Sequence, residues 1–265
     1  MCCPSATFAV WSSAWLSGAA ASDDVLDALD VWGEAHEVVA SGDATATLFD
    51  LPVTGAVPAS PARLLAALRA LGAAGGRLAL PVAGDVRGLG GGGPLTEAAL
   101  RAGEALLLPD LRAGVVPQPI AEGLVRWTVF ATAGPGPAPE YVSLGEAEHG
   151  LTDAVRDSAG ALAELDVARD RPGVRGELSA ALRSSPAPAW PPGMPGRALR
   201  VLQRAEEVGA ILHLARADEP GGAMSASAAT RRADALRPLD NAVRRARCAA
   251  VDEAVRVFAR TSEPS

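Results

Sequence analysis

The chain contains no lysine, and all 24 of its basic residues are arginine. This absence excludes Schiff-base catalysis, a catalytic lysine base and the lysine of a Walker A phosphate-binding loop. The bias also indicates a GC-rich genome, because arginine codons are rich in G and C whereas lysine codons are not.

Aromatic residues make up only 4% of the sequence, so the core must be built from leucine, valine and alanine. Alanine strongly favours helices.

Cysteine is scarce as well, with Cys2, Cys3 and Cys248 as the three examples. An odd number, with two cysteines adjacent at one terminus, forms no disulfide framework. We therefore expect a protein of the reducing cytoplasm.

The first 22 residues contain no charge, and the first basic residue of the chain is Arg63. A secretory signal needs a positively charged n-region, so this segment does not match one, and its serines and threonines disfavour a membrane span. Phe8, Trp11 and Trp15 recur at helical spacing, while the serines of this segment share another face. The pattern favours an amphipathic helix packed on a core over a processed segment.

Positive charge is missing from residues 1–62, which hold eight acids, whereas residues 231–260 hold eight arginines against four acids. Such asymmetry can mark a nucleic-acid face. No aromatic residue is interleaved with the arginines to stack on bases, however, so nucleic-acid binding is disfavoured. We expect the arginines to contact an acidic surface, either residues 23–50 of the same chain or those of a second copy. The arginines concerned are Arg231, Arg232, Arg237, Arg244, Arg245 and Arg247.

Short strand-like and helical patterns alternate over residues 1–132 and predict a small α/β domain with a mixed sheet. Runs at 37–40 and 45–51 read as strands, as do 76–82 and a later hairpin that passes through residues 120–123. Residues 133–140 are rich in proline and glycine and predict a linker. Residues 141–265 carry only helical patterns, at 143–168, 174–184, 196–217 and 223–260, the last as one helix or as two broken near Pro238. They predict a C-terminal helical bundle.

A glycine run follows one of the predicted strands, and its spacing satisfies the dinucleotide fingerprint G-x-G-x-x-G at Gly88, Gly90 and Gly93. The match is weak because five of the six residues from 88 to 93 are glycine and the strand ends several residues too early. A looser anion-binding loop at a helix N-terminus is the alternative to a flexible connector. The candidate ligand-binding residues here are Asp85, Arg87, Gly88 and Gly90.

Other patterns resemble catalytic or metal-binding motifs without completing them. Residues 23–27, "DDVLD", match a magnesium-binding pattern, yet acids are favoured at a helix start in any case. "HEVVA" begins like H-E-x-x-H, but Ala40 stands where the second histidine belongs. Glu146, Glu148 and His149 could form a general-base cluster but are more typical of a solvated helix face. We therefore expect no catalytic residue, no metal site and no cofactor.

Several segments together resemble an actinobacterial family of uncharacterised proteins, among them "LPVAGDVRGL", "GEALLLPDL", "AEGLVRWTVF", "LGEAEHGLTDAVRDSA" and "GRALRVLQRAEEV". The resemblance spans most of residues 7–258. It implies an actinobacterial source and a cytoplasmic protein, and it assigns no catalytic residue.

The sequence therefore favours a non-catalytic cytoplasmic protein that acts in interaction or regulation through its arginine-rich C-terminal helix. We expect a protein partner or self-association and no membrane. The alternative is an enzyme that binds a small molecule or nucleotide between its domains, near the glycine-rich loop at 88–93.

Overall fold

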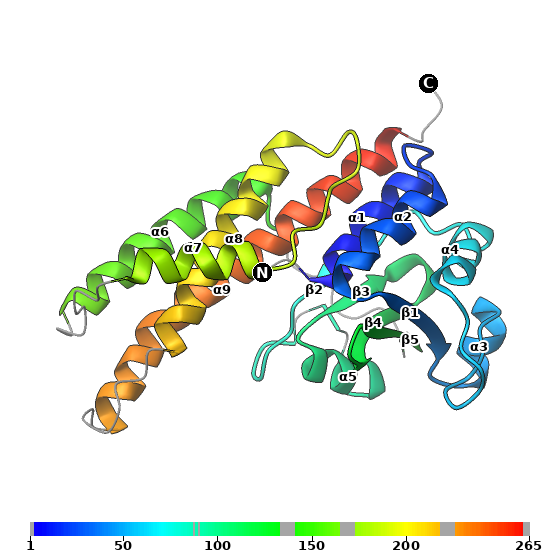
Figure 1. The fold of residues 1–265 in the computed structure, drawn as a ribbon, viewed down its shortest axis with the longest axis horizontal. Helices are drawn as coiled ribbons and strands as arrows, with labels where there is room; N and C mark the ends of the chain where they lie inside the picture. Colours follow the sequence, from blue (N-terminus) through cyan, green and yellow to red (C-terminus); the bar gives the residue numbers. More distant parts are fainter. Residues whose placement is uncertain are drawn as a thin grey trace. The chain divides into compact units, whose positions relative to one another are not determined.

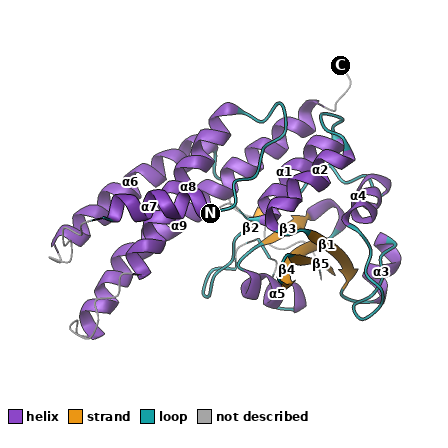
Figure 2. Cartoon of the chain, viewed as in Figure 1, coloured by secondary structure: helices purple, strands orange, loops and turns teal. Residues whose placement is uncertain are grey.

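The computed structural model describes residues 3–86, 88–89, 91–132, 141–164, 173–217 and 226–261. The chain divides into two compact units, which we name by their content. The α/β unit comprises Cys2–Tyr141, Ala187–Pro195 and Val251–Ser265, and the helical unit comprises Val142–Pro186 and Gly196–Ala250. The expected fold class is confirmed, with a mixed-sheet α/β part followed by helices (Figures 1 and 2).

A five-stranded mixed sheet with the order β1-β5-β4-β3-β2 forms the centre of the α/β unit. Its strands are β1 (Ala35–Ala40), β2 (Arg77–Ala79), β3 (Ala105–Leu108), β4 (Ala113–Ala121) and β5 (Leu124–Ala131). β1 and β5 are parallel and the other pairs are antiparallel, with β4 and β5 forming the predicted hairpin. β3 pairs only with the first three residues of β4. Pro117 and Pro119 therefore lie on a stretch of β4 with one open side, where a missing N–H is tolerated.

Helices cover both faces of this sheet. They are α1 (Pro4–Leu16), α2 (Ser22–Leu29) with the 3-10 turn η1 (Asp30–Trp32), α3 (Asp43–Phe49), α4 (Pro61–Ala70) and α5 (Pro94–Ala102), and the 3-10 turn η2 (Pro109–Leu111) follows β3. Phe8 of α1 stacks on Trp127 of β5 at 5.2 Å between ring centroids. Leu95 of α5 packs so closely on Gly114 of β4 that a Cβ there would lie 2.7 Å from the leucine methyl carbons. Because side chains alternate along a strand, α1 and α5 lie on opposite faces (Figure 1).

Helix α1 is buried on all sides, so the expectation of an amphipathic helix was wrong. Ser12 and Ser13 are each only 2% exposed, and their hydroxyls donate to the carbonyl oxygen of Ala9. Trp11 Nε1 donates to the carbonyl oxygen of Ala189, so residues 187–195 contact α1 from the side. Internal hydrogen bonds of this kind let serine replace a hydrophobic residue in a core helix.

The N-terminus of α1 receives a buried carboxylate from the sheet. Gly103 adopts a left-handed conformation (φ 76°) that ends α5, and Glu104 follows it directly before β3. Its Oε2 accepts a hydrogen bond from the backbone N–H of Ser5 at 2.7 Å. Burial is the largest influence on Glu104 and raises its pKa above the ordinary value of 4.5.

One local expectation in this unit was wrong. Residues 45–51 were expected to form a strand, but Asp43–Phe49 form helix α3, in which Thr45 and Phe49 are buried at i and i+4. At the start of α2, Ala21 occupies the N-cap position, and its N–H donates to the Asp24 carboxylate at 2.9 Å.

The helical unit contains α6 (Leu144–Glu164), α7 (Val174–Ser184), α8 (Gly196–Ala217) and α9 (Ala226–Thr261) up to Ala250. The helix predicted at 196–217 is confirmed as α8, and its Val201, Ala205, Val208 and Leu212 are all buried on one side. α9 is one helix that continues through the exposed Pro238. Within the described residues, no helix combines the length and apolar character that crossing a bilayer requires.

Candidate functional site

The glycine-rich loop is described only in part, because Arg87 and Gly90 lie outside the described residues. Asp85 and Val82 exchange two backbone hydrogen bonds, of 2.9 and 3.0 Å, and close a tight turn. Gly88 is partly buried with φ +91°, and Gly93 is the N-cap of α5. The described part thus consists of a turn and a helix start.

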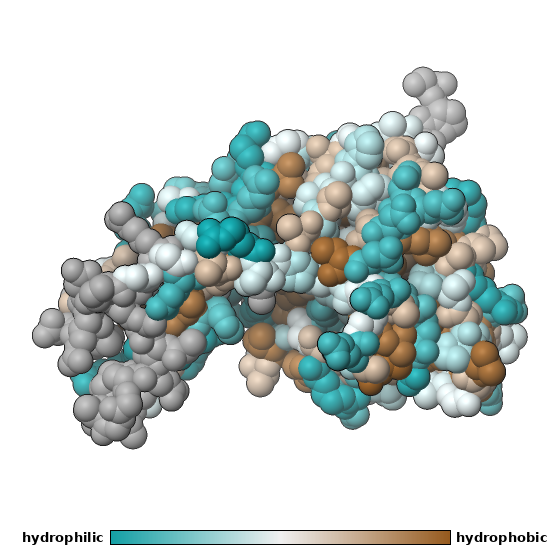
Figure 3. All heavy atoms as spheres, viewed as in Figure 1, coloured by the Kyte–Doolittle hydropathy of each residue, from teal (hydrophilic) through white to brown (hydrophobic). Residues whose placement is uncertain are grey.

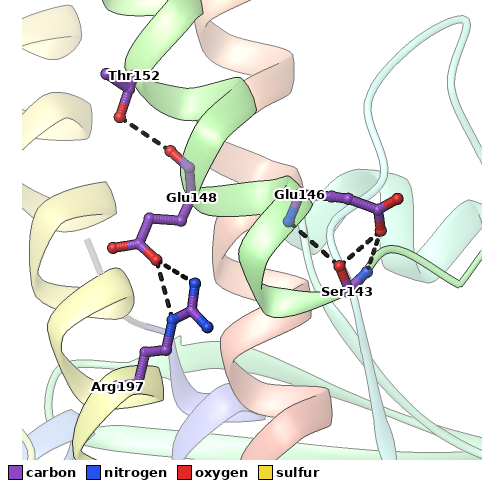
Figure 4. A network of polar contacts seen from close by, with 5 residues as sticks. All are labelled: Ser143, Glu146, Glu148, Thr152 and Arg197. Carbon is purple, nitrogen blue, oxygen red and sulfur yellow. Dashed lines mark hydrogen bonds and ion pairs between the residues drawn. The ribbon is translucent and has the colours of Figure 1, made fainter.

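The carboxylates at the start of α6 make structural contacts with their neighbours (Figure 4). Glu146 Oε2 accepts hydrogen bonds from Ser143 N and Oγ at 2.9 and 2.7 Å, and Glu146 N–H donates to Ser143 Oγ at 3.2 Å. This reciprocal pair is a capping box. Glu148 accepts two hydrogen bonds from Arg197 of α8, at 2.8 and 3.1 Å, and His149 pairs with Asp153 at 3.1 Å. These contacts support the expectation of a solvated helix face.

His36 of "HEVVA" makes an inward hydrogen-bonded pair instead of a metal site. Trp127 Nε1 donates to His36 Nδ1 at 3.1 Å, and indole nitrogen is a donor only. His36 Nε2 must therefore carry the proton that it shares with the Leu29 carbonyl at 2.9 Å. Burial, the largest influence, lowers the pKa of His36 and so favours the neutral ring. Among the described residues no group of three or more His, Cys, Asp or Glu is placed to hold a metal ion.

Hydrophobic side chains give little indication of a binding surface. Leu48 and Val57 are the most exposed large hydrophobic residues of the α/β unit before β2. On the face drawn in Figure 3, hydrophobic residues form separate patches among hydrophilic ones. Scattered patches of this kind are ordinary on a protein surface.

A cavity of about 450 Å³ lies in the helical unit between the end of α7 and the facing sides of α8 and α9. Its volume falls within the usual range of small-molecule sites. The charged residues and the imidazole in its wall are His213 and Arg216 of α8 and Asp240, Arg244 and Arg247 of α9.

Helical spacing explains why these side chains meet. Asp240, Arg244 and Arg247 recur at i, i+4 and i+7 on one side of α9, and Gly209, His213 and Arg216 do the same on α8. Residues at these intervals share a helix face. Gly209 has no side chain, so space remains where the two faces meet.

The arginines of the cavity differ in their ion-pair and hydrogen-bond partners. Arg216 pairs with Asp240, and Arg244 Nη2 donates to Asn241 Oδ1 at 2.6 Å. Arg247 Nε lies 3.2 Å from Glu206 Oε1, with both side chains largely buried at 16% and 21% exposure. Nε and Nη2 of Arg247 are both buried, and neither finds a hydrogen-bond acceptor among the described residues.

The arginine cluster expected from the sequence is therefore divided by the fold. Arg244 and Arg247 line the cavity, and Arg232 donates to the carbonyl oxygen of Ala215 on α8 at 2.5 Å. Arg231, Arg237 and Arg245 are exposed, and Arg237 pairs with Asp234 on its own helix. Neither Arg237 nor Arg247 has its ion pair with residues 23–50.

Sequence analysis missed Arg216, Asp240 and His213 as members of this site. The i, i+4, i+7 recurrence of polar residues on two helices was visible in the sequence. It becomes informative only when the two faces are known to oppose each other.

The chain thus belongs to a class of proteins that combine a mixed-sheet α/β unit with a helical unit, and in this chain arginines line a cavity of the helical unit. Residues 5–143 match the N-terminal domain of Rv1486c-like proteins, and residues 145–248 match their C-terminal domain. The chain belongs to this family, which confirms the expected resemblance to uncharacterised actinobacterial proteins.

Relatives share nearly the whole length of the chain. "Uncharacterized protein Rv1486c" of Mycobacterium tuberculosis strain H37Rv is 38% identical, over 95% of this chain and 96% of the relative. "Uncharacterized protein ML1804" of Mycobacterium leprae is 34% identical, over 95% and 97%. No solved structure matches the chain.

Proposed function

We propose that the protein acts by binding rather than by catalysis, and that its helical unit recognises a negatively charged partner through the arginines of the α7–α8–α9 cavity. The observation that carries the proposal is the convergence of Arg216, Arg244 and Arg247 on one cavity. Among the described residues that line the cavity, the three arginines stand beside one acid, Asp240, and Arg247 also lies near Glu206. The whole chain has a formal net charge of −7, so this is a local reversal of sign.

Catalysis receives less support. A catalytic site needs a nucleophile or base with an orienting group in mutual reach. Of the sequence candidates, His36 has both ring nitrogens engaged, by Trp127 and Leu29, and Glu146 serves as a helix cap. The protein would act in the cytoplasm, where the thiols of Cys3 and Cys248 would be kept reduced.

Two neighbouring arginines provide a test. Arg244→Gln removes a charge from the cavity wall, whereas Arg245→Gln removes one from an exposed position outside it. The probes would be inorganic phosphate, citrate and an acidic hexaglutamate peptide, with binding followed by isothermal titration calorimetry in 25 mM salt. We expect at least one probe to bind, and Arg244→Gln to weaken it about tenfold, as removal of one charge-assisted hydrogen bond does.

Arg245→Gln should stay within about twofold of the unmodified protein, because an exposed charge contributes little. If no probe binds, or if both variants lose the same affinity, the cavity is not the recognition site. A loss confined to Arg245→Gln would place recognition on the outer face of α9.

A further inference from the structure

His213 is the histidine of the chain that has no partner among the described residues. His36 uses both ring nitrogens in hydrogen bonds, and His149 pairs with Asp153. His213 lies on α8 in the wall of the cavity, is exposed, and makes no hydrogen bond or ion pair with any residue that the structure describes. Its two ring nitrogens are therefore accessible to a molecule in the cavity.

The other polar side chains of the wall already have contacts. The hydroxyls of Ser184 and Ser185 at the end of α7 donate to the carbonyl oxygen of Ala181, at 3.1 and 2.7 Å. The charged side chains have partners as well, Arg216 with Asp240, Arg244 with Asn241 and Arg247 with Glu206. A ligand that binds to the imidazole breaks none of these contacts, which keeps the cost of binding low.

The fold places this imidazole beside the arginines of the cavity. His213 and Arg216 stand at i and i+3 on α8, so their side chains share one face of the helix. Gly209, one turn before His213, has no side chain and leaves that part of the wall open. An anion attracted by the arginines thus enters a space that His213 also lines.

Histidine differs from arginine because its charge changes between about pH 5 and about pH 8. The charged groups that share the cavity with His213 are Arg216 on its own helix and Asp240, Arg244 and Arg247 on α9, while the lining residues of α7 carry no charge. Arginine keeps its charge throughout this range. A bound anion favours the protonated imidazole, which attracts the anion and has two N–H donors.

We infer that His213 contacts the anionic group of the ligand and couples its binding to the uptake of a proton. The cavity then binds an oxyanion more tightly under mildly acidic conditions. This inference rests on the proposed function and adds to it a ligand-contacting residue and a dependence on pH.

Sulfate and benzenesulfonate are the probes for this coupling, because both stay fully ionised in the range where histidine titrates. Binding would be followed by isothermal titration calorimetry at about pH 6 and about pH 8. We expect the unmodified protein to bind a probe at least about fivefold more tightly at the lower pH, as one added charge-assisted hydrogen bond allows. Titrations in buffers of different ionisation enthalpy should show that protons are taken up on binding.

The decisive variants change the charge of this one side chain. His213→Gln should reduce the pH effect to less than about twofold and abolish proton uptake, because glutamine does not titrate. His213→Arg carries a permanent charge, so it should bind at the higher pH about as tightly as the unmodified protein does at the lower one. His149→Gln is the matched control, because it removes an exposed histidine of α6 that does not line the cavity, and it should keep the full pH effect.

A direct measurement on the unmodified protein protects the inference against a variant that fails to fold. The imidazole C–H signal of His213, assigned by its absence in His213→Gln, should shift when the probe is added, and that of His149 should stay in place. An unmoved His213 signal under saturating probe overturns the inference.

The remaining outcomes separate this inference from the function on which it rests. If a probe binds equally well at both pH values, or if His213→Gln keeps the pH effect, His213 is not the coupled group and recognition of charge by the arginines stands. If no anion binds at either pH, both proposals are wrong.

Discussion

The carboxylate of Glu104 allows a sharp test of how the α/β unit is held together. Its side chain is 9% exposed, and it accepts the hydrogen bond of Ser5 N–H at the buried start of α1. Replacing Glu104 with alanine removes that acceptor and leaves a buried N–H without a partner, which costs about 1–3 kcal/mol. It also removes one buried methylene group, Cγ, at about 0.8 kcal/mol. We expect Glu104→Ala to lower the free energy of unfolding by about 2–4 kcal/mol.

Glu104→Gln is the matched control, because its amide oxygen can still accept the Ser5 N–H and its volume is nearly the same. We expect it to stay within about 1 kcal/mol of the unmodified protein at neutral pH. The assay is urea unfolding followed by tryptophan fluorescence. All five tryptophans belong to the α/β unit by their positions, at 11, 15, 32, 127 and 190, so the signal reports that unit selectively.

The pH dependence supplies an independent check of the same carboxyl. Burial raises its pKa above 4.5, so between 4.5 and the folded-state pKa the folded protein holds the proton more tightly than the unfolded chain. The contribution of Glu104 to stability is therefore complete below pH 4.5 and is lost as pH rises. Glu104→Gln lacks this loss, so its advantage over the unmodified protein should grow above pH 4.5. Equal stability of the alanine and glutamine variants at every pH would refute the assignment of Glu104 as a buried cap.

Two further predictions concern single contacts. Protonation of His36 would set a second N–H against the indole N–H of Trp127, and burial already lowers its pKa although the nearby Asp30 acts in the opposite direction. The unmodified protein should therefore lose stability as pH falls below about 6.5, and His36→Gln should not show that step in the fluorescence assay. Ser143→Ala breaks the capping box, so amide exchange in the first turn of α6 should become severalfold faster, measured by hydrogen–deuterium exchange. Unchanged exchange there would mean that Glu146 and Ser143 do not cap the helix in solution.

Helix α8 of the second half could be predicted from the sequence because it buries a single stripe. In α8 the stripe through Val201, Ala205 and Val208 follows the helical period, and glycine- and proline-rich segments separate the neighbouring helices. The same rule failed for α1, where Ser12 and Ser13 point into the core and bond to Ala9. A helix that is surrounded by other elements has no solvent face, and periodicity carries no information about it.

Helix α3 is a second element whose structure could not be predicted from its local sequence. Its threonines favour strands by intrinsic preference, and residues 45–51 were expected to form a strand. In the structure Thr45 and Phe49 are buried one helical turn apart, and Asp50 ends the helix in a left-handed conformation with φ 51°. Tertiary packing of two side chains outweighed the preference of the segment. Whether this packing occurs depends on the neighbouring elements, and the sequence of one segment does not specify them.

The candidate site could be predicted only as a set of arginines, because a list of charges does not say which way each one points. Arg244 and Arg245 are adjacent in the chain, but successive helix residues point about 100° apart, so one lines the cavity and the other is exposed. The fold therefore places only some arginines of the sequence cluster on the cavity, and only those can contact a ligand bound there. Arg247 is largely buried beside Glu206, whose Oε1 lies 3.2 Å from Arg247 Nε. The binding hypothesis therefore comes from the placement of particular arginines on one cavity, and the comparison of Arg244→Gln with Arg245→Gln tests it.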